Sequence, residues 1–222
     1  VPVVVGLGGN NTQEIINQLR ELELTGVDGI LSVAPYYNKP SQRGIFQHFK
    51  AIANSCPLPV IIYNVPGRTS CNISSDTCLE LAHECENIIG IKEASGDIAQ
   101  IMRIVKGKPE NFLVISGDDM MTIPVIAAGG SGVISVLANA YPSECSEIVS
   151  NALKGNFKSA RELQFRFLEA IELLFADGNP SGIKAFLSTM NLCQNTLRLP
   201  LVPANKSIST RIQKMVEEIK KG

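Results

Sequence analysis

Histidine is scarce in this sequence and tryptophan is absent. Only two histidines, His48 and His83, occur among 222 residues, and both fall within helical patterns. Histidine-based triads and most zinc sites depend on histidines that converge from different segments of a chain. We therefore expect no metal site, and we interpret His48 as a packing or surface residue of a helix.

A strong net charge, a long apolar run and a leader sequence are also missing. The formal net charge is −1, which gives no reason to expect nucleic acid or a membrane as a partner. No apolar run reaches the roughly 18 residues that span a bilayer, and no basic-then-apolar segment indicates a signal peptide. The six cysteines form no C-x-x-C pair, so we expect reduced thiols in a cytoplasmic protein.

Short apolar runs alternate with helical patterns along most of the chain. Strands are predicted at residues 1–5, 29–34, 60–63, 87–92, 112–115 and 133–136. Between them, helices are predicted at residues 12–24, 75–84, 98–106 and 123–128, with one more that Ser41 caps. From Pro142 onward only helices are expected. This alternation predicts a parallel sheet covered by helices.

About six such units before a helical tail predict an α/β fold of the (β/α)8 TIM-barrel type without its first two βα units. Barrel units 3 to 8 would occupy residues 1–153, and a C-terminal helical extension residues 154–222. The chain starts at Val1, inside a strand pattern, so we expect an N-terminal portion to be missing. The alternative is an open doubly wound sheet, but no G-x-G-x-x-G motif follows any predicted strand.

One apolar strand contains a lysine, Lys92, and it is the only lysine inside such a run. An amine where an apolar strand ends is poorly hydrated, so its pKa should fall and the neutral form can attack a carbonyl to form a Schiff base. The alternative is an ordinary strand-end lysine whose stem packs and whose head reaches water or pairs with Glu93.

The preceding strand ends in Tyr63, also at its last apolar position. In barrels of this type, active sites lie at the carboxyl ends of the strands, and adjacent strands are close enough for both side chains to reach one small molecule. Acid–base work would fall to the Tyr63 hydroxyl. Arg68, in the following loop, is either an ordinary loop arginine or a group that binds a substrate carboxylate.

Three further segments allow two interpretations each. Tyr36 and Tyr37, on a loop between two prolines, either pack over the barrel or insert into a neighbouring subunit. The Asp118–Asp119 pair either binds a metal or caps the next helix, which is the commoner role. The glycine-rich segment 129–132 precedes its strand, which puts it at the non-catalytic end and argues against a phosphate loop.

These residues stand within a set of motifs that occur in order. The motifs are Pro35-Tyr36-Tyr37-Asn38, Tyr63-Asn64-Val65-Pro66-Gly67-Arg68-Thr69, Gly90-Ile91-Lys92-Glu93-Ala94, Ser116-Gly117-Asp118-Asp119, Gly132-Val133-Ile134-Ser135-Val136 and Leu197-Arg198-Leu199-Pro200. The set closely resembles the 4-hydroxy-tetrahydrodipicolinate synthase (dihydrodipicolinate synthase) family, over the whole chain. The resemblance implies a (β/α)8 barrel with a C-terminal helical extension, usually assembled as a homotetramer.

The resemblance also implies a mechanism for the condensation of pyruvate with L-aspartate 4-semialdehyde. Lys92 would form the Schiff base with pyruvate, which binds covalently as a substrate, and no cofactor is implied. Tyr63 would be the proton donor and acceptor, and Tyr37 would complete a proton relay from the adjacent subunit. Arg68 would bind the carboxylate of the semialdehyde. The backbone at Ile134 and Gly117 would contact pyruvate.

Regulation and completeness follow from the same resemblance. Asn10, Glu14 and Tyr36 match the positions of an L-lysine allosteric cleft and have suitable residue types, which allows feedback inhibition. The family's Gly-Thr-Thr-Gly-Glu motif, which supplies a relay threonine and a pyruvate carboxylate site, is not in this sequence. As an entire polypeptide the chain would form an incomplete, inactive barrel with exposed strand edges; as an excerpt it would come from an active enzyme.

Two other functions remain open at this point. A sister pyruvate-lysine aldolase, such as N-acetylneuraminate lyase or a 2-keto-3-deoxy sugar acid aldolase, would share the tyrosine and the lysine. Arg68 and the Tyr36–Tyr37 pair favour the synthase. A non-catalytic homologue or subunit fragment that only associates with other chains is the alternative of another class.

Overall fold

The computed structural model describes residues 1–221, and these contain a sheet of six parallel strands. The strands are β1 (Val4–Gly6), β2 (Gly29–Val33), β3 (Val60–Asn64), β4 (Ile88–Glu93), β5 (Leu113–Ser116) and β6 (Gly132–Val133). They pair in the order of the sequence, each with the next. A doubly wound sheet would reverse its strand order part-way, so the sequential order contradicts that alternative and confirms a parallel α/β fold.

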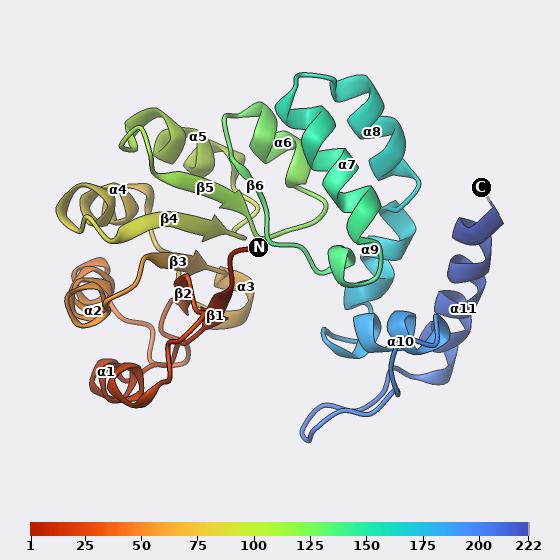
Figure 1. Ribbon diagram of the computed structural model, residues 1–222, viewed down its shortest axis with the longest axis horizontal. Helices are drawn as coiled ribbons and strands as arrows, with labels where there is room; N and C mark the ends of the chain where they lie inside the picture. The colour runs from red at the N-terminus through yellow and green to blue at the C-terminus, as the bar shows by residue number, and fades with distance from the viewer. Residues whose placement is uncertain (222) are drawn as a thin grey trace. The chain divides into compact units, whose positions relative to one another are not determined.

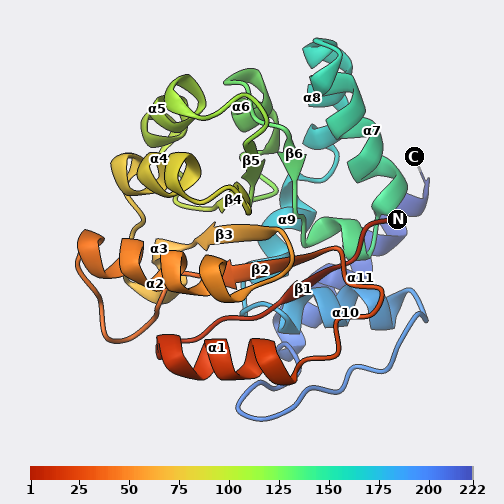
Figure 2. The same cartoon turned by 60° about the vertical axis from the view of Figure 1, so that its left-hand side comes forward.

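Helices cover one side of this sheet. They are α1 (Thr12–Glu21), α2 (Gln42–Ser55), α4 (Ser75–Glu84) and α5 (Ile98–Gly107). Two shorter helices are α3 (Pro66–Thr69), which follows β3, and α6 (Thr122–Ala127), which precedes β6. Both views place α1, α2, α4 and α5 on the same side of the strands (Figures 1 and 2). Ile15, Leu19, Phe49, Ile52 and Leu81 are buried on the sheet-facing sides of these helices.

The helix starts follow from local capping chemistry. Asn11, Ser41, Ser74 and Asp97 each stand before a helix and accept hydrogen bonds from backbone N–H groups of its first turn. Such a side chain satisfies donors that have no partner within the helix. The predicted cap at Ser41 is confirmed. Helix α1 is shorter than predicted and ends at Glu21 rather than at residue 24.

The prediction of a strand at residues 133–136 is wrong. The strand ends at Val133, and the chain enters a 3-10 helix, η1 (Leu137–Asn139). The backbone N–H groups of Val136 and Leu137 donate to the carboxylate of Asp119, at 3.0 and 3.2 Å, instead of pairing with a strand. A contact between residues this far apart in the chain overrides the local β propensity.

The chain forms two compact units. The first contains Val1–Gly117 and Pro124–Ile134, and the second contains Asp118–Ile123 and Ser135–Gly222. After η1 the second unit is helical, with α7 (Pro142–Leu153), α8 (Phe157–Phe165), α9 (Leu168–Phe175), α10 (Ser181–Thr189) and α11 (Lys206–Lys221). The predicted helical tail is confirmed. The boundary at residue 153 stays a prediction.

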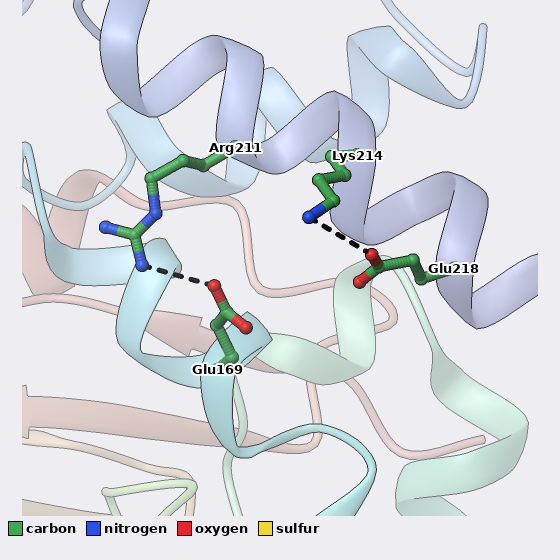
Figure 3. Close-up of polar contacts among 4 residues, drawn as sticks. All are labelled: Glu169, Arg211, Lys214 and Glu218. Carbon is green, nitrogen blue, oxygen red and sulfur yellow. Dashed lines mark hydrogen bonds and ion pairs between the residues drawn. The ribbon is translucent and has the colours of Figure 1, made fainter.

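The second unit has an apolar core and a polar surface of its own. The ring of Tyr141 lies 5.0 Å from that of Phe167, between centroids, within a cluster of buried side chains. On the outside, Arg211 of α11 pairs with Glu169 of α9 at 3.2 Å, and Lys214 pairs with Glu218 (Figure 3). These ion pairs are exposed, so each contributes less than about 1 kcal/mol to stability.

In the part of the chain that the structure describes, none of the helices combines the length and the apolar character needed to cross a membrane.

The six cysteines are free thiols, and five of them are buried. Burial raises the pKa of the Cys145 thiol to about 11, which keeps it protonated and unreactive at neutral pH.

Candidate active site

Strands β3 and β4 bring Lys92 and Tyr63 together. The two residues are paired directly in the parallel register, and Nζ of Lys92 lies 4.2 Å from the centroid of the Tyr63 ring. Both side chains are half-buried. Each is the last residue but one of its strand, because β3 and β4 extend one residue further than predicted, to Asn64 and Glu93.

Gly117, directly after β5, leaves the space in which the lysine stem lies. A Cβ atom added to Gly117 would lie 3.1 Å from both Cγ and Cε of Lys92 and 2.8 Å from Cβ of Ala94. Contacts this short are tighter than van der Waals packing allows. The absence of a side chain at Gly117 therefore permits the observed position of Lys92.

The backbone N–H groups of Gly117 and Ile134 are already engaged. Gly117 donates to the carbonyl of Glu93 at 2.7 Å, and Ile134 donates to the carbonyl of Ser116 at 2.9 Å. Both bonds continue the parallel ladder past the last strand residue. If these two residues contact a substrate, the contact must come from other atoms than these two N–H groups.

Comparison with known proteins agrees with this geometry. The model of the dihydrodipicolinate synthetase family matches residues 1–219. The 4-hydroxy-tetrahydrodipicolinate synthase of Flavobacterium psychrophilum is 48% identical over 221 residues, which are 100% of this chain and 75% of that protein. The chain belongs to the dihydrodipicolinate synthetase family.

Solved structures of the same family share the fold. Dihydrodipicolinate synthase of Acinetobacter baumannii complexed with pyruvate has a TM-score of 0.94 and 36% identity, over 99% of this chain and 75% of that one. The enzyme of Cyanidioschyzon merolae with lysine bound has a TM-score of 0.93 and 38% identity, over 97% of this chain and 73% of that one.

In this member of the dihydrodipicolinate synthetase family, Arg68 lies in the last turn of α3, after β3. Its side chain is exposed. Pro66 begins α3, and Ser70 ends it in the left-handed backbone region, with its N–H donating to the carbonyl of Pro66. Arg68 is therefore on the loop that leaves the carboxyl end of β3, which is the end near which Tyr63 and Lys92 lie.

The Tyr36–Tyr37 segment is held in a tight turn after β2. The N–H of Asn38 donates to the carbonyl of Tyr36 at 2.9 Å, and Tyr37 between them has a φ of 74°, a conformation that is unfavourable for a bulky side chain. Tyr37 is 87% exposed and Tyr36 44%. This turn projects an aromatic ring outward, and strain of this kind is often found at functional sites.

The three positions of the expected lysine cleft lie after β1 and β2. Nδ2 of Asn10 donates to the carbonyl of Tyr36 at 3.1 Å, and Asn38 donates in return to the carbonyl of Asn10 at 2.9 Å. Glu14 is exposed in the first turn of α1. The two loops that carry Asn10 and Tyr36 are thus bonded to each other.

Asp118 and Asp119 have different roles in the structure. Asp118 accepts the N–H of Met120 at 2.9 Å, which is a local cap. Asp119 is 6% exposed and accepts from the hydroxyl of Ser135 and from the N–H groups of Val136 and Leu137 at the start of η1. Within residues 1–221, no group of three or more His, Cys, Asp or Glu side chains could hold a metal. The contact between Ser135 and Asp119 was not predicted from the sequence, because it joins residues that are 16 positions apart.

His48 is buried on α2, 5% exposed. Its Nδ1 lies 2.8 Å from the hydroxyl of Thr12, while its Nε2 is buried without a hydrogen-bond partner. Burial lowers the pKa of His48 to about 4. Of the two predicted roles, packing and helix surface, the structure shows packing, and the residue stays neutral at physiological pH.

A cavity of about 510 Å³ lies in the second unit. It is lined by Pro180, Lys184, Thr196, Leu197, Arg198 and Leu201. Leu197 and Arg198 belong to one of the motifs that carry the family resemblance, but sequence reasoning assigned them no role.

Proposed function

We propose that this protein condenses pyruvate with L-aspartate 4-semialdehyde to 4-hydroxy-tetrahydrodipicolinate, a step of lysine and diaminopimelate biosynthesis. Membership of the dihydrodipicolinate synthetase family supports the proposal. The observation that carries it is the position of the Lys92 amine, 4.2 Å from the centre of the Tyr63 ring. A primary amine beside a phenol is the minimal apparatus for Schiff-base chemistry.

The chemistry assigns one task to each group. The neutral amine of Lys92 attacks the keto carbon of pyruvate, and water leaves as the C=N bond forms. Loss of a methyl proton gives an enamine, whose carbon attacks the aldehyde carbon while the aldehyde oxygen takes up a proton. The amino group of the semialdehyde then displaces Lys92 as the ring closes. Tyr63 carries protons between these steps.

The other site residues have supporting roles in the proposal. Tyr37 reaches the active site of an adjacent subunit and completes a proton relay there, which agrees with its exposure of 87%. Arg68 binds the carboxylate of the semialdehyde. Gly117 and Ile134 lie against pyruvate. No metal or organic cofactor is required, because the lysine itself provides the electron sink.

The architecture and assembly of the family complete the proposal. The six strands correspond to the third to eighth strands of a (β/α)8 barrel, and the helices after residue 153 form its C-terminal extension. The subunits form a homotetramer, a dimer of dimers, in the cytoplasm. L-Lysine inhibits by binding at Asn10, Glu14 and Tyr36, and a family member of known structure does have lysine bound.

Trapping of the covalent intermediate tests the proposed function. The complete protein is incubated with pyruvate, reduced with borohydride and digested for peptide mass spectrometry. We expect one adduct, on Lys92, and none in the K92A variant. Absence of the adduct in intact protein contradicts the proposal. An adduct together with turnover of a sugar acid, but not of the semialdehyde, assigns the protein to the sister aldolases.

A further inference from the structure

Glu93, the neighbour of Lys92 in the chain, is a carboxylate buried on the other face of β4. It is only 1% exposed. Oε1 accepts the backbone N–H of Ser95 at 2.7 Å, Oε2 accepts Nε2 of Gln100 at 3.0 Å, and both oxygens lie 3.1 Å from Nδ2 of Asn64. Each partner brings an N–H group to the carboxylate, which is the arrangement that suits an ionised, acceptor-only group.

The contact extends into what we call the Glu93 network, made of Asn64, Asn72, Glu93 and Gln100. Asn64 is fully buried; its Nδ2 also donates to Oδ1 of Asn72 at 2.8 Å, and its Oδ1 accepts the N–H of Ile73 at 2.9 Å. Asn72 donates to Oε1 of Gln100 at 2.9 Å. The network therefore ties the ends of β3 and β4 to helix α5.

The position of this network in the sheet register matters for the active site. Asn64 pairs with Glu93, one step beyond the pair formed by Tyr63 and Lys92. Because successive residues of a strand point to opposite faces, the two pairs stand back to back across the sheet. A shift of Asn64 relative to Glu93 therefore also displaces Tyr63 relative to Lys92.

Losing one member of the network has a defined physical consequence. A buried carboxylate is tolerated only while donors surround it. Without the Asn64 amide, the carboxylate must find a replacement donor or admit water, and either change moves the end of β4. Burial, with a smaller contribution from the charge of Glu93, also raises the pKa of the Cys78 thiol on α4, which agrees with Glu93 facing the helices.

We propose that Glu93 and Asn64 are positioning residues: their buried contact holds β3 and β4 in the register that keeps Nζ of Lys92 over the Tyr63 ring. The inference rests on the proposed function for its catalytic consequence. Neither residue touches the reacting atoms; both act through the pair on the opposite face.

The test compares N64A and E93Q with the matched variant N87A in the complete protein. Asn87 anchors the opposite end of the same strand, where its Nδ2 donates to the carbonyls of Ala53 and Cys56 at 2.8 and 3.2 Å. Its loss thus removes two partly buried side-chain hydrogen bonds without touching the catalytic end. The Q100L variant removes one hydrogen-bond donor of Glu93. It replaces N64A in the comparison if N64A does not fold.

Steady-state kinetics provide the first measurement, at a temperature where each variant is fully folded. A displaced amine lowers kcat by about 10- to 100-fold and leaves KM for both substrates within about 3-fold, because a displacement on the order of 1 Å is costly in the chemical step. N87A should keep the kcat of the unaltered protein. A loss that is equal in N64A and N87A overturns the proposal.

Competitive acylation of Lys92 across a pH series, read by peptide mass spectrometry, provides a measurement that needs no substrate. N64A retains the Glu93 side chain, so a rise of the labelling midpoint of Lys92 by about half a unit or more reports a better-hydrated amine. An unchanged midpoint in N64A and E93Q contradicts the positioning role. If the unaltered protein labels at Lys92 but forms no pyruvate adduct, the proposed function fails while this comparison still decides the inference.

Discussion

At the scale of single residues, Gly117 is important because it has no side chain. The G117A variant would place a methyl group 2.8 Å from Cβ of Ala94 and 3.1 Å from two carbons of the Lys92 stem, so the end of β4 that carries the lysine must shift, at a cost of about 1–3 kcal/mol. We expect pyruvate trapping at Lys92 to slow by about 10-fold or more. Borohydride reduction and peptide mass spectrometry measure this rate.

Gly67 provides the control for this prediction. A Cβ atom added to Gly67, an exposed residue of α3, would meet nothing within 4 Å. The G67A variant should therefore trap pyruvate at the rate of the unaltered protein. Equal rates in G117A and G67A would show that the lysine stem tolerates the methyl group.

His48 supports a prediction about acid stability. The unfolded chain takes up a proton on His48 near the ordinary pKa of 6.5, whereas the folded protein does so only near 4. This contribution to stability is complete above pH 6.5 and is lost as the pH falls from there towards 4. We expect about 2 kcal/mol of it to be lost at pH 5.

Urea unfolding at pH 7 and pH 5 measures the effect of His48. The H48Q variant can keep a hydrogen bond to Thr12 and has no group that titrates, so its stability should fall less between these pH values. The control is H83Q, which replaces the exposed histidine that contacts the carbonyl of Gly107. H83Q should lose as much stability between pH 7 and pH 5 as the unaltered protein does. If the free energy of unfolding of H83Q is the same at both pH values, His48 is not the source of the acid sensitivity.

At the scale of elements, Asp119 determines how the chain leaves β6. Its carboxylate accepts two backbone N–H groups and the hydroxyl of Ser135, which itself accepts the N–H of Ala138 at 2.8 Å. The D119A variant leaves these donors without a partner. We expect a loss of about 3 kcal/mol in the free energy of unfolding, measured by urea denaturation.

Asp76 offers the comparison for Asp119. It lies exposed in the first turn of α4, so D76N should change stability by less than about 0.5 kcal/mol. If D119A is no less stable than D76N, the capping role of Asp119 in η1 is wrong.

The elements also show which local predictions succeed. Helix α4 begins at Ser75 and ends at Glu84, as predicted, because Ser74 caps it and its apolar spacing is regular. The strand predicted at residues 133–136 is mostly absent, because the Ser135 hydroxyl and the N–H of Val136 donate to the distant carboxylate of Asp119. Local signals are reliable where the bonds are local, and they fail where Asp119 binds residues 16 to 18 positions further along.

At the scale of the whole molecule, the placement of Tyr37 in an adjacent subunit can be tested by complementation. The complete Y37F and K92A variants are each expected to be inactive. In a hybrid dimer, one site combines an intact Lys92 with an intact Tyr37 from the neighbouring subunit. Random exchange of an equal mixture should restore about a quarter of the activity.

Native mass spectrometry verifies that hybrids have formed in this mixture. Recovery of activity with hybrid formation supports a shared site. Verified hybrids without activity would show that Tyr37 acts within its own subunit or not at all. A mixture of K92A with an equally inactive K92R variant is the control and should stay inactive, because no site in it has an intact Lys92.

The sequence alone was sufficient for the parallel α/β order, the cap at Ser41, the helical tail and the placement of Lys92 and Tyr63 near strand ends. These depend on apolar periodicity and on side chains within a few residues of one another. The direct pairing of Tyr63 with Lys92, the donors around Glu93 and the reach of Asp119 were decided only by the tertiary structure. The Tyr63–Lys92 pair, the Asn64–Glu93 contact and the contacts of Asp119 with residues 135–137 join positions 16 to 29 apart, and such contacts exist only once the chain has folded.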